Sequence, residues 1–386
     1  MKRSTERILT THTGSLPRPA DLISILQAKE TGQPYDPQAF GQRVQTAVAE
    51  AVQNQVASHV DIVSDGEMGK PGFFHYVRSR LRGLEGLNAT ASQSPDPDFP
   101  GYLEWRMRHG RGTAGIITGR VECIGPLEWK DKAAMEIDIA NFKAALTSVH
   151  VEEAFMPAAS VGIVAQRIDN KYYPTYEQWV QAIAEVMQEE YQAITKAGLL
   201  LQIDAPEMPI DRNNPEFRDR PVQEFRKRLE LWVEALNHAL TGIPEEQVRL
   251  HVCWGNSEGP HLRDVPLEQI VDIVLKAHVA AYSIEAANPR HAHEWKLWKT
   301  VQLPAGKMLI PGVIDSTTNF VEHPELIADR ILNYANLVGR ENVIAGSDCG
   351  FGTSATSEMV YPPIVWAKLQ AMSEGAQLAS KQLWRT

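Results

Sequence analysis

The chain contains eight short apolar runs, each of which ends in polar residues and most of which precede a segment with helical spacing. The runs lie at residues 7–19, 61–67, 153–160, 199–207, 249–256, 280–285, 307–315 and 342–350. Strand, polar tip and helix form a repeating unit, which is typical of parallel α/β folds. A doubly wound open sheet gives similar local signals, but eight units without a linker favour a closed barrel. We therefore expect a single (β/α)8 TIM barrel, with residues 1–386 as one domain.

Two segments before the third predicted strand do not fit this repeat. Residues 83–112 contain Pro, Gly, Ser and Asp with little periodicity, so we predict a long loop from Asn88 to Pro100 over the mouth of the site. Gly115–Ile124 alternates between apolar and polar residues, which predicts an exposed β-hairpin outside the main sheet.

The composition argues against several kinds of partner. A formal net charge of -10 and the lack of a Lys/Arg run argue against binding to nucleic acid or to an anionic membrane. No apolar stretch reaches the ~18 residues of a membrane span, and the first residues lack the apolar region of a signal peptide. We therefore expect a cytoplasmic protein. In that compartment the three cysteines are buried apolar residues or thiolate ligands rather than a disulfide framework.

The most specific motif of the chain is His251-Val-Cys253, at the end of an apolar run. Alternation along a strand places His251 and Cys253 on the same face. Two later strand ends carry Glu285 and Cys349. One histidine, two cysteines and a carboxylate suit the tetrahedral, borderline-soft preference of Zn²⁺. We predict that these four side chains bind one zinc ion.

Each of these residues also has a simpler interpretation. A single cysteine in an apolar run is more often part of the core than a ligand, and we interpret Cys123 in this way. Glu285 can be an ordinary polar strand end or a hydrogen-bonding partner of His251. For the whole group, the alternative is a closed, structural zinc site in a barrel that has no catalytic function.

Polar residues end most of the predicted strands, and the active sites of TIM barrels lie at the carboxyl ends of the strands. The residues in such positions are Ser15, Glu67, Asp204, His251, Cys253, Glu285, Asp315 and Cys349. We expect them to face one cavity, although they are far apart in the sequence.

The His251-Val-Cys253 strand, the strand that ends in Glu285 and the turn at 347–350 resemble the catalytic barrel of cobalamin-independent methionine synthase. Further similar segments are Thr13-Gly14-Ser15, Asp65-Gly66-Glu67, Gln202-Ile203-Asp204 with Pro206, and Gly312-Val313 with Asp315. The resemblance spans nearly the whole chain and implies a methionine-synthase-like barrel in which zinc binds the thiol of homocysteine, the methyl acceptor. It also implies that Ser15 holds the carboxylate of the acceptor, and that Glu67 and Asp204 hold its ammonium group.

Departures from that family bear on the alkyl donor. Ser316-Thr317 stand where the family has a histidine that helps to protonate the departing folate, and Gln166 stands where it has a tryptophan that stacks on the pterin. We also expect no second, N-terminal barrel of the kind that the family carries, because one barrel accounts for the 386 residues. We therefore expect a donor other than methylfolate. The segments 253–261 and 285–294 look closer to the single-barrel branch that includes epoxyalkane:coenzyme M transferase, whose electrophile is an epoxide.

Zinc chemistry explains what these branches share. A free thiol has a pKa of about 8.5, and coordination to Zn²⁺ removes its proton and presents a thiolate. Two cysteinates and a glutamate make the ion electron-rich, which favours nucleophilic sulfur over polarised water. A leaving group that needs a proton requires an acid, for which the candidates are Asp315, His12, His291 and His293.

Three further residues are candidates for contacts with substrate. Trp254 directly follows the ligand motif and can form a wall of the donor pocket. Arg18 and Arg290 can pair with a carboxylate or sulfonate on either substrate, because a guanidinium group matches such oxygens. The alternatives are a core position for the tryptophan and exposed surface positions for the arginines.

We therefore expect a zinc-dependent transferase that moves a methyl or other alkyl group to the sulfur of a small thiol, either homocysteine or a compound like coenzyme M. Although the departures from the family disfavour methylfolate, the sequence does not by itself separate it from a methylated corrinoid protein or a small sulfonium or methoxy compound as the donor. Addition of the thiol to an epoxide is the alternative reaction. A non-catalytic barrel with a structural zinc site is the alternative class.

Overall fold

Eight parallel strands form the central sheet, in the order β1-β11-β10-β9-β8-β7-β5-β2. The computed structural model describes residues 1–88, 98–108, 120–356 and 358–384. The strands are β1 (Leu9–Thr10), β2 (Ile62–Ser64), β5 (Glu153–Ala159), β7 (Leu200–Asp204), β8 (Val248–Val252), β9 (Ala281–Ile284), β10 (Met308–Ile314) and β11 (Ile344–Ser347). Each apolar run of the sequence contributes one strand. The predicted single (β/α)8 TIM barrel is confirmed.

Side-chain hydrogen bonds join the two ends of this sheet, β1 and β2. Thr11 Oγ1 donates to the carbonyl of Ile62 at 3.0 Å, and Ser64 Oγ donates to the carbonyl of Gly14 at 2.9 Å. These bonds bring the loop after β1 next to the loop after β2, and both loops carry residues of the predicted site.

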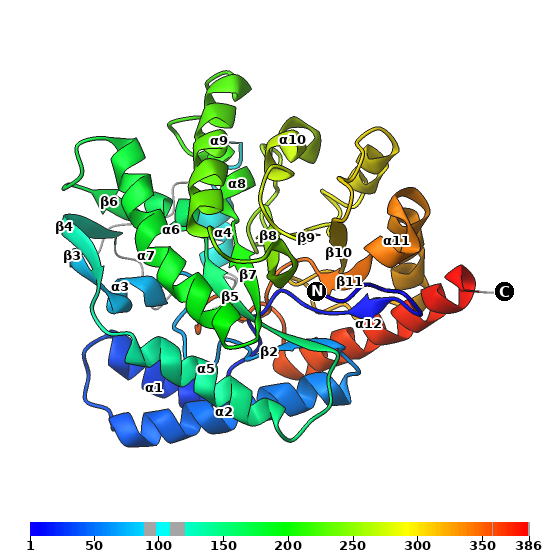
Figure 1. Cartoon of the computed structure of the whole chain (residues 1–386), viewed down its shortest axis with the longest axis horizontal. Coiled ribbons are helices and arrows are strands. Elements are labelled where there is room, and N and C mark those ends of the chain that lie inside the picture. Colours follow the sequence, from blue (N-terminus) through cyan, green and yellow to red (C-terminus); the bar gives the residue numbers. More distant parts are fainter. Residues whose placement is uncertain (89–97, 109–119, 357, 385–386) are drawn as a thin grey trace.

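Helices cover the outside of the barrel, as Figure 1 shows. The α-helices of the described residues are α1 (Ala20–Glu30), α2 (Pro37–Ala57), α3 (Tyr76–Arg80), α4 (Tyr102–Arg108), α5 (Ala133–Leu146), α6 (Val161–Arg167), α7 (Tyr176–Lys196), α8 (Glu207–Ile210), α9 (Val222–Ala239), α10 (Val271–Val274), α11 (Pro324–Val338) and α12 (Pro362–Leu383). Of these, α6 and α8 also contribute residues to the pocket described below. Local signals set the ends of the helices: Asp36 caps α2 by accepting two backbone hydrogen bonds, and Pro37 occupies its first turn. Among the described helices, none is both long enough and apolar enough to cross a membrane.

The inside of the barrel changes from apolar to polar toward the carboxyl ends of the strands. An apolar cluster lies near the amino ends and consists of Leu9, Ile62, Phe155, Leu200, Ala280, Ala281, Met308, Ile310 and Ile344. Next to it, the buried guanidinium group of Arg249 lies 3.5 Å from the centre of the Phe155 ring. Arg249 donates to Gln202 Oε1 at 2.8 Å and to the carbonyl of His12 at 2.7 Å. This buried polar layer supports the strand ends on which the site is built.

A second, smaller sheet lies beside the barrel and consists of β3 (Leu81–Asn88), β4 (Arg120–Trp129) and β6 (Ile168–Asn170). β3 and β4 form an antiparallel hairpin, and β6 pairs with β4 in parallel. An extra hairpin before the third barrel strand is therefore confirmed. Its expected position within Gly115–Ile124 is wrong, because 120–129 is one strand whose partner begins at Leu81. Gly83, with a φ of 82°, interrupts the alternation of that partner and hides it in the sequence.

Parts of the predicted hairpin and of the predicted loop lie outside the residues that the structure describes. They are 115–119 of the predicted hairpin and 89–97 of the predicted loop Asn88–Pro100. The helix α4 follows that loop in the described part of the chain.

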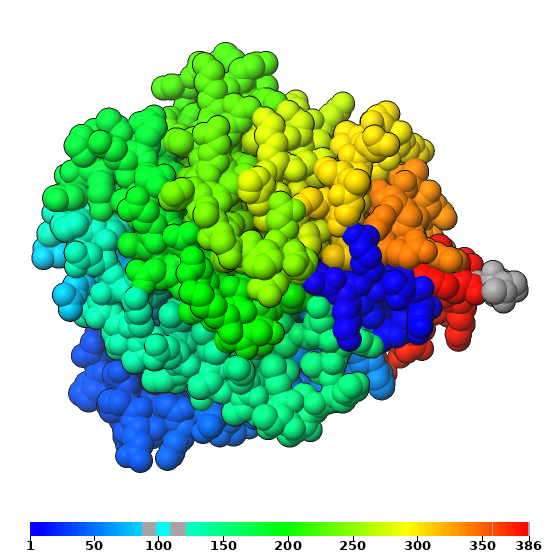
Figure 2. Space-filling model, viewed as in Figure 1, coloured from blue at the N-terminus to red at the C-terminus, as the bar shows by residue number. Residues whose placement is uncertain are grey.

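The two ends of the described chain pack against each other. Trp384 Nε1 donates to the carbonyl of Thr5 at 2.9 Å, and the backbone N–H of Ile8 donates to Ser380 Oγ at 2.9 Å. Figure 2 shows the N-terminal residues, in dark blue, against the red C-terminal segment. The first strand is thus held in place by the last helix, α12.

Candidate metal centre and substrate pocket

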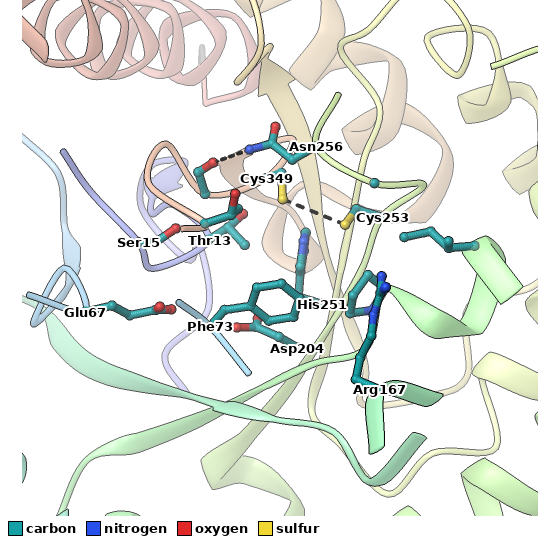
Figure 3. A pocket seen from close by; sticks show the side chains of 15 residues that line it. Thr13, Ser15, Glu67, Phe73, Arg167, Asp204, His251, Cys253, Asn256 and Cys349 are labelled. Atoms are coloured by element: carbon teal, nitrogen blue, oxygen red, sulfur yellow. Dashed lines mark hydrogen bonds between the residues drawn. The ribbon is translucent and has the colours of Figure 1, made fainter. Parts of the chain in front are cut away.

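Three side chains with soft ligand atoms meet at the mouth of the barrel. His251 lies in β8, Cys253 follows that strand, and Cys349 follows β11. The Sγ atoms of Cys253 and Cys349 lie 3.7 Å apart. One ligand atom from each of the three residues lies within 4.8 Å of the other two. The structure thus brings together three of the four residues that we predict to bind metal, as Figure 3 shows.

The separation and the chemistry of these atoms fit a tetrahedral zinc ion. Two thiolates with Zn–S bonds of about 2.3 Å lie about 3.8 Å apart on such an ion, which matches the 3.7 Å between the two sulfur atoms here. His251 Nδ1 lies 3.3 Å from Ser283 Oγ, whereas His251 Nε2 is buried without a hydrogen-bond partner among the described residues. A buried nitrogen without a partner is costly unless a ligand uses it. Elsewhere in the described residues, no three His, Cys, Asp or Glu ligand atoms come this close.

Glu285 lies beside this group, but hydrogen bonds engage its carboxylate. Its Oε2 accepts a bond from the backbone N–H of Trp254 at 2.6 Å, and its Oε1 accepts one from the side-chain amide of Asn288. Burial, followed by the charge of Asp348, raises the pKa of the Glu285 carboxyl well above its usual range. Glu285 therefore holds the backbone next to Cys253, and it must exchange a hydrogen bond to reach a metal ion.

Asp348 ties together two segments of the site, and sequence reasoning missed it. Its Oδ1 accepts hydrogen bonds from the backbone N–H groups of Ala286 and Ala287, both at 2.7 Å, and its Oδ2 accepts one from Asn288 at 2.8 Å. Successive backbone N–H groups around one anion form a compact binding concavity. Because Asp348 precedes Cys349, these bonds fix the cysteine relative to the loop after β9.

A pocket with a volume of about 170 Å³ opens beside the three ligand side chains. Its lining consists of Thr13, Ser15, Glu67, Phe73, Arg167, Asp204, Pro206, Ile210, His251, Cys253, Gly255, Asn256, Cys349, Gly350 and Thr353. The residues that we predict to contact the acceptor, Ser15, Glu67 and Asp204, thus share one cavity with His251 and the two cysteines.

Glu67 and Asp204 form an acidic wall of this pocket. Burial raises the pKa of Glu67 to about 7 and that of Asp204 to about 6. Glu67 Oε2 is buried without a partner among the described residues, and the Glu67 backbone has a φ of 57°, which is strained for a residue with a side chain. A buried carboxylate oxygen without a donor is suited to bind a cation such as an ammonium group.

Ser15 lies against the backbone that follows Cys349. The N–H of Phe351 donates to the carbonyl of Ser15 at 2.8 Å. A Cβ atom at Gly350 would lie 2.0 Å from Ser15 Oγ, so that a larger residue at this position would displace the Ser15 side chain. The loops after the first and the last barrel strand therefore place an expected acceptor contact beside an expected metal ligand.

The predicted substrate contact Arg18 takes a different place. Its side chain is buried, and its guanidinium group donates to the carbonyls of Gly352 at 2.7 Å and Glu67 at 2.8 Å. Arg18 is not among the described residues that line the pocket. It instead holds together the two loops that carry the acidic wall and the last pocket residues.

Two of the candidate acids, His12 and Asp315, are likewise not among the described residues that line the pocket. His12 Nε2 donates to Gln55 Oε1 at 2.7 Å, and its Nδ1 accepts from the N–H of Gly14 at 3.1 Å. Burial lowers the pKa of His12 to about 3, so its ring is neutral at pH 7 and both ring nitrogens are occupied. Asp315 Oδ1 accepts hydrogen bonds from the N–H and the hydroxyl of Thr317, both at 2.9 Å. Both side chains have local structural partners in these positions.

His291 and Trp254 support the ligand segment from behind. The His291 ring stacks on the Trp254 ring with 4.0 Å between centroids, and its nitrogens lie 3.0 Å from Asp264 Oδ2 and 3.1 Å from Glu294 Oε2. Burial lowers the pKa of His291, but hydrogen bonds to these carboxylates outweigh burial and raise it to about 9. Neither His291 nor Trp254 is among the described residues that line the pocket. Their contacts therefore act on the backbone next to Cys253.

Sequence reasoning gave no role to Asn256 and Arg167, which both line the pocket. Asn256 Nδ2 donates to the carbonyl of Gly350 at 2.8 Å, and its Oδ1 accepts from Ser316 Oγ at 2.8 Å. The available signal for Asn256 was its position in the Gly-Asn turn directly after the ligand motif. Arg167 ends a helix and carries no comparable signal.

Together, the fold and the site define a TIM-barrel protein whose mouth combines a cysteine-rich group able to hold a metal with a polar pocket. Residues 113–377 match the family described as the catalytic domain of cobalamin-independent synthase. The chain belongs to this family, and the resemblance seen in its sequence is confirmed.

Relatives match over almost their full length. The methionine synthase of Thermococcus kodakarensis is 22% identical over 377 residues, which cover 97% of this chain and 94% of that protein. The 2-hydroxypropyl-CoM lyase of Xanthobacter autotrophicus is 22% identical over 409 residues, which cover 97% of this chain and 96% of that protein. The structure of a B12-independent methionine synthase from Shewanella sp. W3-18-1 has the same fold, with a TM-score of 0.73, 18% identity and coverage of 98% of this chain and 99% of that one.

Proposed function

We propose that the protein is a zinc-dependent transferase that moves a methyl or other alkyl group to the sulfur of a small thiol. The observation that carries this proposal is the approach of His251, Cys253 and Cys349 to within 4.8 Å of one another in the lining of a pocket. A structural zinc site is closed by four protein ligands, whereas a catalytic site keeps one position for substrate. Three ligands that face a pocket match the second arrangement.

His251, Cys253 and Cys349 would hold the ion, with Glu285 as the fourth ligand before the substrate arrives. Bound Zn²⁺ would supply a Lewis acid that keeps a substrate thiol deprotonated at neutral pH. The thiol proton passes to solvent, a bond forms between sulfur and the alkyl carbon, and the leaving atom of the donor departs with the electron pair of the broken bond. The role of the pocket residues is to orient the acceptor for this displacement.

Homocysteine is the acceptor that we propose. Glu67 and Asp204 offer buried carboxylates to its ammonium group, and Ser15 offers a hydroxyl to its carboxylate. The name of the Thermococcus kodakarensis relative, methionine synthase, supports this choice. An acceptor without an amino group, such as coenzyme M, would leave the acidic wall without a counter-charge.

For the donor, we propose a small compound or a methylated corrinoid protein rather than methylfolate. Gln166, at the position where the family has its pterin-stacking tryptophan, donates to Asp211 Oδ1 at 2.7 Å and offers no aromatic surface. The candidate acids Asp315, His12 and His291 do not belong to the described pocket lining. A donor whose leaving atom is already positive needs no acid, which favours a sulfonium or a methylated corrinoid.

Addition of a thiol to an epoxide is the second candidate, and the similarity to 2-hydroxypropyl-CoM lyase favours it. Here the sulfur–carbon bond forms as the epoxide C–O bond breaks, and the resulting alkoxide takes up a proton. That reaction yields a hydroxyalkyl thioether, whereas transfer from a sulfonium yields a methyl thioether and a neutral sulfide. The mass of the product therefore separates the two reactions.

Variants of the cysteines test the proposal. The zinc-loaded protein is incubated with homocysteine or coenzyme M and a panel of donors, and S-alkyl products are measured by mass. We expect Cys253→Ala and Cys349→Ala to lose at least 100-fold in turnover and most of their zinc while remaining folded, and Cys123→Ala to keep both. Loss of the folded state together with the metal would instead indicate a structural zinc site.

We also infer that residues 1–386 act as one domain, because β1 pairs with β11 at the other end of the chain. A cytoplasmic location agrees with this proposal, because reducing conditions keep Cys253 and Cys349 as thiols.

A further inference from the structure

Contacts with the segment after β7 fix the first turn of α6. Ser160 Oγ accepts a hydrogen bond from the N–H of Ile163 at 3.0 Å, which caps the start of the helix, and it donates to Glu207 Oε1 at 2.7 Å. A Cβ atom at Gly162 would lie 2.4 Å from the same carboxylate, so the helix packs tightly on the segment after β7. Arg167 is the last residue of this short helix and belongs to the lining of the pocket.

Two adjacent residues at this helix end point to different partners. Gln166 is bonded to Asp211, whereas Arg167 lines the pocket. The guanidinium carbon of Arg167 lies 5.6 Å from the centre of the Phe74 ring, which supports it from one side. The residue next to Gln166 thus brings a cation to the lining of the pocket.

The charges of the pocket are divided between its two sides. Figure 3 places Ser15 and Glu67 on one side of His251 and Arg167 on the other. The Glu67 side suits the ammonium group of the acceptor, and in this view His251, with Asp204 next to it, lies between Glu67 and Arg167. A molecule that approaches the bound sulfur from the Arg167 side meets a guanidinium group, whose fork matches a carboxylate.

We propose that Arg167 binds a carboxylate of the alkyl donor, so that this protein takes a compact donor that carries an anionic group. This inference rests on the proposed function, because it names the donor class of the same pocket. For a sulfonium donor the step is balanced: the methyl carbon leaves the positive sulfur and bonds to the acceptor sulfur, a neutral thioether departs, and the acceptor's thiol proton goes to solvent.

A matched pair of probes tests the inference without requiring turnover. The probes are 3-(dimethylsulfonio)propanoate and its propanamide, which share size and sulfonium charge and differ only in the carboxylate. Binding of each to the zinc-loaded protein with homocysteine is measured by calorimetry. We expect the propanoate to bind about 10-fold to 100-fold more tightly than the propanamide, the range of a charge-assisted, bidentate contact.

Three variants assign this preference to one side chain. Arg167→Met should abolish it, and Arg167→Lys should keep part of it, because lysine retains the charge but loses the fork. Arg226→Met is the matched control, since Arg226 pairs with Asp272 on the helical exterior at 2.7 Å, and it should keep the full preference. Thermal unfolding confirms that each variant is folded.

The outcomes separate this inference from the proposed function. Equal affinity of the wild-type protein for the two probes, including no measurable binding of either, overturns the inference, as does a preference that survives in Arg167→Met. A preference that depends on Arg167, without any S-methyl product from any donor, supports the anion site and counts against alkyl transfer. Equal rates of methionine formation from both probes support alkyl transfer and overturn the role of Arg167.

Discussion

The Sγ atoms of Cys253 and Cys349 lie 3.7 Å apart although 96 positions of the sequence separate the two residues. Their strands, β8 and β11, are not neighbours in the barrel, because β9 and β10 lie between them. The cysteines therefore meet only because the sheet curves and both strands end at the same rim. The short distance between the two thiols leads to different predictions for the protein with and without metal.

Oxidation of the metal-free protein should join Cys253 and Cys349 in a disulfide. Their sulfur atoms need to approach by about 1.7 Å to reach a bond length of about 2.0 Å, and zinc would protect both thiols by holding them as ligands. Mass spectrometry of unreduced peptides after mild oxidation measures the cross-link. The Cys123→Ala variant should behave like the wild type, and a cross-link that forms equally fast with saturating zinc would contradict the proposed ligand set.

Binding of a thiol should replace an oxygen ligand of zinc by sulfur. We expect Glu285 to complete the coordination before substrate arrives and then to return to the hydrogen bonds that it makes with Trp254 and Asn288. Zinc K-edge spectra should show one nitrogen, two sulfur and one oxygen ligand without homocysteine, and a third sulfur in place of the oxygen with it. Identical spectra in both states would show that the substrate sulfur does not enter the coordination sphere.

Affinity for the amino-acid ligand should rise with pH through the titration of Glu67. Burial raises the pKa of Glu67 to about 7, so its carboxylate is largely protonated at pH 5.5 in the free protein. A bound ammonium group favours the ionised form, and binding should therefore strengthen as the pH rises from about 5.5 to 8. Methionine is a suitable probe because neither its thioether nor its ammonium group titrates in this window.

The Glu67→Gln variant is the control for this pH dependence. It should bind methionine about 10-fold more weakly at pH 8. The pH dependence that remains should have its midpoint near pH 6 instead of pH 7, because Asp204, with a pKa of about 6, is then the only titrating carboxyl of the acidic wall. A wild-type affinity that is constant, or that falls as the pH rises, would count against a contact between Glu67 and the ammonium group.

Asp348→Asn should weaken both the fold and the retention of metal. The Asp348 carboxylate accepts three backbone hydrogen bonds, and an amide would turn its NH₂ group toward at least one of these donors. We expect the free energy of unfolding to fall by about 1–3 kcal/mol and zinc to transfer faster to a chelator. Asp329→Asn, at an exposed position of α11, should change neither quantity. Unchanged stability and zinc retention in Asp348→Asn would show that Asp348 does not position Cys349.

The sequence predicts the barrel and the grouping of its ligands because both depend on short-range patterns. Apolar runs with polar ends mark the strands, and the alternation of His251 and Cys253 puts both on one face. Parallel strands that close into a barrel then bring Cys349 to the same rim. No knowledge of packing between distant segments is required for these inferences.

The roles of Asp348, Arg18 and Arg167 could not be predicted in this way. Asp348 and Arg18 bond to backbone groups, which are present at every residue and leave no mark in the sequence. Arg167 lines the pocket only because α6 packs against the segment after β7, where Ser160 and Gly162 contact Glu207. The partner of β4 was missed for a similar reason, since glycines in β3 break the alternation that identifies strands.

The contact of Ser15 with Gly350 joins a residue near the start of the chain to one close to its end. During synthesis, the rim therefore stays incomplete until nearly every residue has left the ribosome, because the segment directly after β11 supplies both Cys349 and the glycine that Ser15 contacts. A product that stops before residue 344 has neither feature. Truncated or nicked forms that lose this segment therefore lack one of the two thiols of the Cys253–Cys349 pair and cannot assemble the His251, Cys253 and Cys349 group.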